Sequence, residues 1–238
     1  GLVTGEMIKP GAIVIDVGEH PAEIHRCLKD LRITAIPLMV LTHSHADHIG
    51  GWLGAARGRE IGTVLVGPWG AEGVGLELRS AKAGDLMRVG DVKIEVLWPR
   101  VAAASVSSGQ EPGGQPADHQ SRDPNNDSLV LHVTTDKFSM FFTGDIGAEV
   151  AQRLQPQLKQ ADLVKVQHHG SADMWPGLYD LTKPRAAVIG VGADNRHGHP
   201  HPDLLGTLEE RGIAAWRTDE LGTFAVVVDG STLKAVPR

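Results

Sequence analysis

The feature that most limits the fold is a histidine-rich run, His43-Ser-His-Ala-Asp-His48, directly after the apolar stretch Pro37–Leu41. Such a stretch is typical of a buried strand, and side chains just past a strand end project into a cleft. Alternation along an extended segment puts His43 and His45 on one side, as a chelating pair. Asp47 and His48 then turn away, where they can bind a second ion. The run therefore predicts a strand that ends at a polar site.

The residue types in this run suit a metal ion. Imidazole and carboxylate together favour zinc or manganese, and hydrolytic sites keep one position open for water. A solvated polar loop is the plain alternative, but the preceding strand and the following Ile49-Gly-Gly favour a site. Cys27 is the only cysteine, which excludes an internal disulfide and a cysteine-built metal site.

Composition narrows the class of protein. No stretch approaches the roughly 18 apolar residues that a membrane span needs. Acidic residues outnumber basic ones by 29 to 23, giving a net charge of −6, which counts against a passive DNA-binding module. It counts less against an enzyme, because two bound divalent cations would add about +4. The chain begins Gly-Leu-Val without a methionine, which fits a piece of a longer protein.

Strand and helix patterns alternate along the chain. We expect strands at 12–16, 37–41, 63–66, 128–133, 138–142, 163–166, 186–189, 224–228 and 232–235, a hairpin over 86–97, and helices at 22–31, 49–56, 148–158, 175–181 and 202–211. Residues 101–123 are rich in Ser, Gly, Gln and Pro, which predicts a mobile surface insertion. Candidate ligands fall on both sides of it, so we predict a single domain over 1–238.

The order of strand, His-x-His-x-Asp-His and a distant Thr143-Gly144-Asp145 after an apolar strand resembles the metallo-β-lactamase superfamily. That resemblance implies the α/β (α+β) class and a four-layer αβ/βα sandwich. Two central mixed sheets would pack face to face, with helices outside and two divalent metal ions, manganese or zinc, at one edge. It also implies a metal-dependent hydrolase.

Further motifs resemble one branch of that superfamily, the C-terminal hydrolase domain of the ComEC DNA-uptake (competence) proteins. They are Lys165-Val-Gln-His-His-Gly-Ser171, Asn195-Arg-His-Gly-His-Pro200 and Asn125-Asn-Asp-Ser128. The resemblance runs from Ala12 onward. It departs at the front, where the Val-Gly-Gln-Gly-Asp segment usual in that group is absent, so we expect one strand to be missing.

This resemblance implies a metal-dependent phosphodiesterase, a DNA nuclease that degrades the non-imported strand during DNA uptake. Its partners would be single-stranded DNA and the transmembrane channel region of the same full-length protein. It would lie as a soluble domain at the extracytoplasmic face of the cell membrane. Exo- or endonuclease action and the oligomeric state stay open.

The resemblance also assigns the metal site. The expected ligands are His43, His45, Asp47, His48, Asp145 and His169. Asp145 matches the carboxylate that bridges both ions, although Gly-Asp after a strand is also a common turn. Asp16 resembles an aspartate that supports the site from behind the ligands. The expected catalytic groups are Asp47, Asp145, His168 and His199.

Strand alternation bears on the His168-His169 pair, because both cannot face one way if the strand continues through them. We take His169 as the ligand and His168 as the residue that faces the substrate or supports the site, a choice that parity does not settle. In the 194–201 loop, His199 is a candidate proton donor or phosphate contact. His197 and His201 are ordinary loop histidines, and His119 falls in the insertion.

The superfamily's usual third histidine for the first ion is missing, and Asn125 occupies the comparable place. It is a candidate for binding metal or substrate, with an Asx turn as the equally plain alternative. Asn195 and Ser171 are candidate substrate contacts, Ser171 also resembling a helix N-cap. Trp175 is a candidate for base stacking, with core packing favoured.

Two other functions compete with the nuclease. One is a small-molecule metallohydrolase acting on a lactam, lactone or thioester, which the missing histidine disfavours. The other is a non-catalytic scaffold or DNA-binding domain of a membrane channel, which the near-complete ligand set disfavours.

Overall fold

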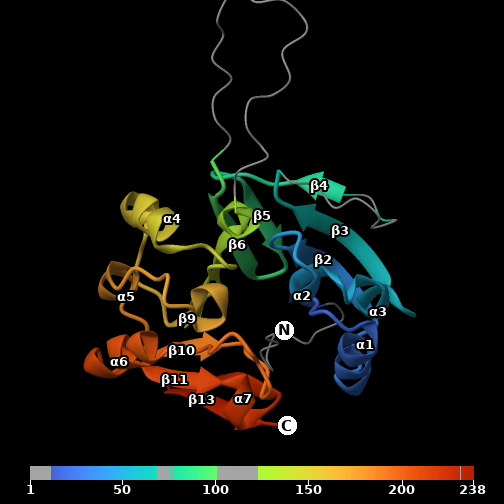
Figure 1. Cartoon of the computed structure of the whole chain (residues 1–238). Coiled ribbons are helices and arrows are strands. Elements are labelled where there is room, and N and C mark those ends of the chain that lie inside the picture. Colours follow the sequence, from blue (N-terminus) through green and yellow to red (C-terminus); the bar gives the residue numbers. More distant parts are fainter. Residues whose placement is uncertain (1–11, 69–75, 77, 101–122, 231) are drawn as a thin grey trace, which may run out of the picture.

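The computed structural model describes residues 12–68, 76, 78–100, 123–230 and 232–238, so the expected insertion at 101–123 lies almost wholly outside the described residues. Two sheets face each other, and helices cover the outer face of each (Figure 1). The predicted α/β class and four-layer αβ/βα arrangement are confirmed.

The first sheet has four strands in the order β1-β2-β3-β4. They are β1 (Ile13–Ile15), β2 (Ala35–Leu41), β3 (Glu60–Val66) and β4 (Leu78–Ser80). Every described pairing in this sheet is parallel, so the expectation of two mixed sheets is wrong for this one. Parallel neighbours need crossover connections, and α1 (Pro21–Asp30) makes the one from β1 to β2.

The second sheet is mixed, with seven strands in the order β11-β10-β9-β8-β7-β6-β5. They are β5 (Leu86–Val89), β6 (Val92–Trp98), β7 (Val130–Thr134), β8 (Ser139–Phe142), β9 (Leu163–Lys165), β10 (Ala186–Ile189) and β11 (Ala214–Arg217). The β5–β8 part is antiparallel and the β8–β11 part is parallel. A separate hairpin, β12 (Phe224–Asp229) and β13 (Thr232–Pro237), closes the chain.

Side-chain alternation along β2 shows how the layers form. Leu38 and Val40 point into the core between the sheets, where they meet residues of β6 and β7 such as Ile94 and Leu131. Met39 and Leu41 point the other way, towards α1 and α3 (Trp52–Ala56). Because β2 is buried on both faces, its sequence is a continuous apolar run, which is the pattern of a central parallel strand.

Three helices pack against the outer face of the second sheet: α4 (Ala148–Arg153), α5 (Gly177–Thr182) and α6 (Pro202–Glu210). There are also three short 3₁₀ turns: η2 (Pro124–Asp127) before β7, η3 (Gln155–Gln157) after α4 and η4 (Gln167–Gly170) after β9. The helix α7 (Thr218–Leu221) follows β11. The sequence did not predict β4, β11 or α7, which are too short for a clear period.

Two predicted helices are shorter than expected. The helix expected at 49–56 is two pieces, α2 (Ala46–Ile49) and α3, with Gly50 and Gly51 between them. A Cβ at Gly51 would lie 2.2 Å from the Val17 carbonyl oxygen, so the two backbone segments pack here at a distance that only glycine allows. The helix expected at 148–158 ends at Arg153, and Pro156 lies in the 3₁₀ turn that follows.

Candidate metal centre

The candidate site lies where strands of both sheets end. Asp16 follows β1, His43 follows β2, Asp145 follows β8, and His169 follows β9. These strands are parallel within their sheets, so their carboxyl ends meet at one edge, where α/β proteins usually bind ligands. The fold thereby brings together residues that are far apart in the sequence.

Four of the predicted ligands form a compact cluster: Asp47, His48, Asp145 and His169, whose donor atoms all lie within 4.8 Å of one another. His48 Nε2 lies 3.3 Å from His169 Nε2, 3.5 Å from Asp47 Oδ2 and 3.3 Å from Asp145 Oδ2. His169 Nε2 lies 3.2 Å from Asp47 Oδ2 and 3.1 Å from Asp145 Oδ2. Ligands about 2.0–2.1 Å from a tetrahedral zinc ion are about 3.3–3.4 Å apart, so this donor set fits a small divalent cation.

The outer nitrogens of the two clustered histidines support the same conclusion. His48 Nδ1 donates to Asp16 Oδ2 at 2.9 Å, and His169 Nδ1 donates to the Gly190 carbonyl oxygen at 2.6 Å. In a neutral ring the Nε2 atom then carries a lone pair, and the two lone pairs point at a common centre. Such an arrangement needs a cation or protons between the rings.

Protons can occupy that place when no metal is bound. Burial alone would lower the pKa of His48, but Asp16 and Asp145 outweigh it and raise the pKa to about 9. Burial likewise opposes protonation of His169, and hydrogen bonds to Asp145 and Asp47 raise its pKa to about 9. A metal ion binding here must displace these protons, as metal sites generally require.

The carboxylates of the cluster are held ionised. The hydrogen bond from His169 is the main cause that lowers the pKa of Asp47. Burial would raise the pKa of Asp145, yet the charge of Lys165 and the hydrogen bonds from His169 and His48 lower it strongly. Both groups therefore offer anionic oxygens at neutral pH.

His43 and His45 form a second pair beside the cluster. Nε2 of His43 lies 3.1 Å from Nδ1 of His45, and the His43 ring is 4.0 Å from the His48 ring, centroid to centroid. Burial and the charge of His48 lower the pKa of His43 to about 4, so its ring is neutral and able to bind a metal. This pair has the geometry of two ligands for a further ion.

Asp16 holds the site from behind, as the resemblance implied. Its carboxylate accepts hydrogen bonds from Thr42 N at 2.8 Å, Thr42 Oγ1 at 2.9 Å and His48 Nδ1. The Thr42 hydroxyl lies 3.3 Å from His43 Nδ1, so it links Asp16 to that ring as well. One carboxylate thus orients a residue of each candidate ion site.

His168 and His169 do not continue the strand. β9 ends at Lys165, and both histidines have left-handed backbone conformations, with φ of 45° and 52°. His169 turns into the cluster, while the His168 ring faces His199 at 5.5 Å. Strand parity therefore does not apply at this position.

The loop after β10 carries His199. Burial and the neighbouring charges of His168 and His169 lower the pKa of His199. The Asn195 amide is bonded within this loop, accepting from His199 N at 3.1 Å and donating to the His199 carbonyl oxygen at 2.9 Å. Asn195 thus fixes His199, and both polar atoms of its amide are engaged within the loop.

The other predicted contacts have varied surroundings. Asn125 is 9% exposed, and its Oδ1 has no hydrogen-bond partner among the described residues. Its expected Asx turn is made instead by Asp123, whose Oδ1 accepts from Asn125 N at 3.1 Å. The Ser171 hydroxyl accepts from Asp173 N at 3.1 Å, and Trp175 is half-buried against the helix-side core.

Sequence reasoning missed Lys165. Its Nζ lies 3.2 Å from Asp145 Oδ1, and the side chain is 17% exposed. The residue stands three positions before the His168-His169 pair, at the strand end, which is the signal that could have identified it.

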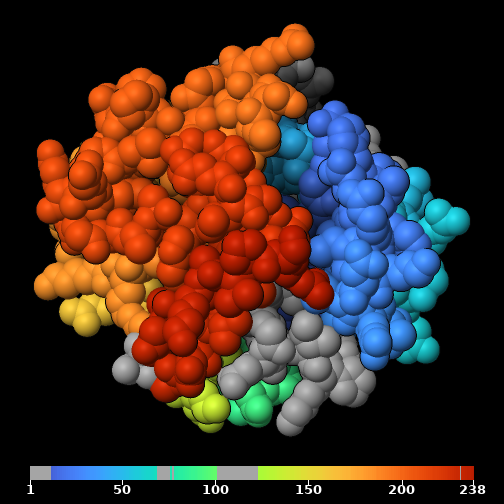
Figure 2. Space-filling model, turned by 90° about the horizontal axis from the view of Figure 1, so that it is seen from below, coloured from blue at the N-terminus to red at the C-terminus, as the bar shows by residue number. Residues whose placement is uncertain are grey.

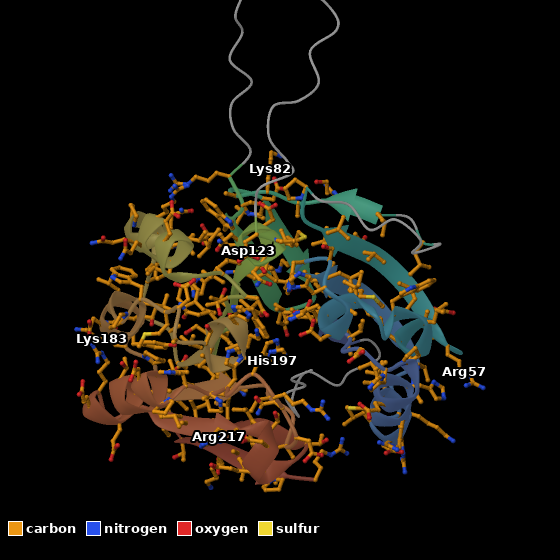
Figure 3. The ribbon with its side chains drawn as sticks, in the orientation of Figure 1. Arg57, Lys82, Asp123, Lys183, His197 and Arg217 are labelled. Atoms are coloured by element: carbon orange, nitrogen blue, oxygen red, sulfur yellow. The ribbon has the colours of Figure 1, made fainter. Side chains whose placement is uncertain are left out.

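Side chains of both sheets meet around the cluster, and a cleft opens beside α1. In Figure 3, Asp123 and His197 lie on either side of the central region where side chains from both sheets meet. Figure 2 shows a hollow between α1, in blue, and the C-terminal part of the chain, in orange and red. A cleft of about 950 Å³ there is lined by Val17, Glu23, Cys27 and Thr223, among others. Val17 N donates to the His48 carbonyl oxygen, but the residues that line the cleft include none of the predicted metal ligands.

Comparisons with known proteins agree with this fold. ComE operon protein 3 of Bacillus subtilis (strain 168) is 29% identical over 208 residues, which are 80% of this chain and 24% of that protein. The chain therefore matches about a quarter of that relative's length.

Two solved structures share the fold. One, from Parabacteroides distasonis, is named as a candidate metal-dependent hydrolase, with a TM-score of 0.50, 16% identity and coverage of 79% of this chain and 78% of that one. The other is CmlA, a diiron β-hydroxylase from Streptomyces venezuelae, with a TM-score of 0.52, 13% identity and coverage of 77% and 44%.

The family match covers most of the chain. The sequence pattern of the metallo-β-lactamase superfamily matches residues 8–210, which include every predicted metal ligand. The chain belongs to the metallo-β-lactamase superfamily, whose characteristic chemistry is metal-dependent hydrolysis.

Proposed function

We propose that this chain is a two-metal phosphodiesterase that cleaves single-stranded DNA during DNA uptake. The observation that carries the proposal is the unequal supply of the two candidate ion sites. Asp47, His48, Asp145 and His169 supply one site with four donors. The other has His43 and His45, and the further histidine whose ring lies against His43, His48, already belongs to the first site.

Asn125 is our candidate for completing the weaker site. Its turn lies against the strand ends of the site, since Leu129 N donates to the Thr42 carbonyl oxygen and Asp145 N donates to Ser128 Oγ. Its buried, unpartnered Oδ1 is an atom that a ligand would satisfy. An amide oxygen is a harder ligand than imidazole, which favours manganese as much as zinc.

Asp47, His48, Asp145 and His169 would hold a divalent ion, which when bound would lower the pKa of a water to about 7 and offset charge on a phosphoryl group. Asp145 fixes the cluster, and Asp16 and the Gly190 carbonyl oxygen orient the rings of His48 and His169. His199 has a lowered pKa, so its neutral ring donates a hydrogen bond from N–H to a phosphoryl oxygen. The ring of His168 lies beside that of His199, which supports our proposal that His168 contacts the substrate.

A cationic side chain near His199 suits a polyanionic substrate in spite of the acidic net charge. Arg196 is exposed on the loop that carries His199. Such groups contact phosphates without reading the base sequence.

The proposed place of this chain within a longer protein rests on its similarity to the competence-operon relative. Its greater length supports our proposal that this chain is one domain of a longer protein, joined to a transmembrane channel region and placed at the extracytoplasmic face of the membrane. Within the described part of the chain, no helix has the length and apolarity needed to cross a bilayer.

The test is hydrolysis of labelled single-stranded DNA, nitrocefin and a lactone, each with Mn²⁺, Zn²⁺ or chelator. We expect metal-dependent cleavage of DNA alone. Cleavage of nitrocefin or the lactone without DNA cleavage would assign a small-molecule hydrolase. No turnover by protein with verified bound metal would assign a scaffold.

Asp145→Ala is the matched loss-of-function variant, with His20→Ala, an exposed histidine at the start of α1, as the control. Removal of Asp145 should cost more than the 10–100-fold typical of groups behind the ligands, so we expect a DNA cleavage rate reduced by at least about 100-fold. A wild-type rate in Asp145→Ala would contradict the two-metal site.

A further inference from the structure

One ammonium group lies against the metal cluster and takes no part in the chemistry proposed for the substrate. Lys165 ends β9, and its Nζ lies 3.2 Å from Asp145 Oδ1 and 2.9 Å from the Gly144 carbonyl oxygen. Its own backbone carbonyl accepts a hydrogen bond from Thr143 Oγ1 at 2.7 Å. Both ends of Lys165 are therefore fixed to the Thr143-Gly144-Asp145 turn.

The two oxygens of Asp145 consequently have different partners. Oδ1 accepts from Lys165, whereas Oδ2 faces His48 Nε2 at 3.3 Å and His169 Nε2 at 3.1 Å. The Asp145 side chain is only 3% exposed, so no solvent is available to exchange these roles. The geometry points to Lys165 as a positioning residue that makes Asp145 a one-oxygen metal ligand, by occupying Oδ1 and leaving Oδ2 alone to the ions. This inference rests on the metal site of the proposed function but not on its substrate.

The charge of Lys165 has two consequences for a bound ion. A carboxylate that donates only one oxygen gives less negative charge to the ion and leaves a coordination position open for water. A fixed ammonium also repels a divalent cation across a poorly solvated site. Lys165 therefore weakens metal binding while it keeps the site reactive.

These effects distinguish a positioning role from a merely structural one. Without the ammonium, Asp145 can use both oxygens, so the metal should bind more tightly and the hydrolysis rate should fall. If Lys165 only supported the fold, its loss would weaken metal binding and turnover together. The two quantities move in opposite directions only if Lys165 controls the carboxylate.

The experiment is a Co²⁺ titration of metal-free Lys165→Met, followed by visible absorption and by competition with a chelator. We expect an affinity at least about tenfold above wild type, because one repulsive charge is lost. We also expect weaker visible bands per Co²⁺, as the coordination number rises. Lys165→Arg keeps a cation and should stay within about threefold of wild type.

Lys159→Met is the matched control. It removes another lysine paired with a carboxylate, Glu95 at 3.0 Å, at a site exposed to solvent. This variant should leave the Co²⁺ affinity and spectrum unchanged. Lys165→Gln provides a second neutral variant if the methionine protein does not fold, with folding checked by circular dichroism.

Three results would overturn the inference: Co²⁺ affinity equal to or below wild type in folded Lys165→Met or Lys165→Gln, a Lys165→Arg protein that behaves like Lys165→Met, or wild-type protein that binds no Co²⁺. A failure of the nuclease proposal looks different. There, the affinities shift as expected while loaded wild-type protein leaves DNA intact.

Discussion

At the scale of single residues, the site depends on a carboxylate that is placed behind the ligands. Asp16 has a left-handed backbone, with φ of 55°, which turns the chain as β1 ends. Its two oxygens accept three hydrogen bonds, two from Thr42 and one from His48. Burial would raise its pKa, but the charge of His48 and these hydrogen bonds lower it. Asp16 therefore stays anionic and fixes which nitrogen of His48 faces the ion.

Asp16→Asn tests this role with little change in shape, since Asn also tolerates a left-handed conformation. The amide NH₂ cannot accept from His48 Nδ1 or the Thr42 hydroxyl, so the His48 ring loses its orientation. We expect a metal affinity lowered by about 10–100-fold, measured with metal buffers.

Asp85→Asn is its control, because Asp85 also accepts from a backbone N–H, that of Lys82, at an exposed turn. Equal metal affinities of Asp16→Asn and wild type would show that Asp16 serves only the fold.

At the scale of elements, the site is built from turns that follow strand ends. Gly144 lies between β8 and Asp145 with φ of 52°, and an added Cβ would lie 2.5 Å from Ser128 Cβ. The same turn accepts hydrogen bonds from His168 N and Lys165 Nζ at the Gly144 carbonyl oxygen. The turn therefore aligns Asp145 with the β9 end and with η2.

Gly144→Ala should destabilise the protein more than Gly84→Ala. Gly84 also has a positive φ, of 92°, but an added Cβ there meets nothing within 4 Å. Backbone strain of order 1–3 kcal/mol destabilises both variants. Only Gly144→Ala adds a steric clash with Ser128. Urea denaturation should show a loss of unfolding free energy at least about 1 kcal/mol larger for Gly144→Ala. Equal losses would mean that the turn can relax around a side chain.

The sequence could predict what is local in the chain. The His43–His48 run lies within one strand end and one short helix, so its spacing alone indicated how its ligands group. The left-handed turn at His168 and His169 broke the strand on which the parity argument depended. Lys165 and Asn195 act through hydrogen bonds set by the tertiary fold, which no spacing reveals. The parallel first sheet was likewise hidden, because strand direction depends on how the chain crosses over.

At the scale of the whole molecule, the layers also bury groups that the site does not use. His132 lies in the middle of the second sheet, where its ring stacks on Phe141 at 4.5 Å. Burial first, and then the charge of Lys159, lower its pKa below the ordinary value. The folded protein therefore keeps this ring neutral under mildly acidic conditions in which the unfolded chain takes up a proton.

The sign of the pH dependence follows from this difference. At His132 the unfolded chain binds more protons than the folded one below about pH 6.5. The contribution of His132 to the free energy of unfolding therefore falls as the pH falls from there towards the lowered pKa of the folded residue. His132→Phe removes that contribution and should lose less stability than wild type between about pH 7.5 and 5.5. Urea denaturation at both pH values measures this loss of unfolding free energy. The contributions of the site histidines cancel in the comparison because both proteins carry them. Parallel losses would place His132 in contact with solvent.

The central claim is that the strand ends of the two sheets hold divalent ions. Anomalous X-ray diffraction at the zinc edge, on crystals grown with Zn²⁺, tests it most directly. The account predicts one peak about 2.0–2.2 Å from donor atoms of Asp47, His48, Asp145 and His169, and a second beside His43 and His45. A map in which zinc is absent from the four-residue cluster, with His48 and His169 still paired to the carboxylates, would contradict it.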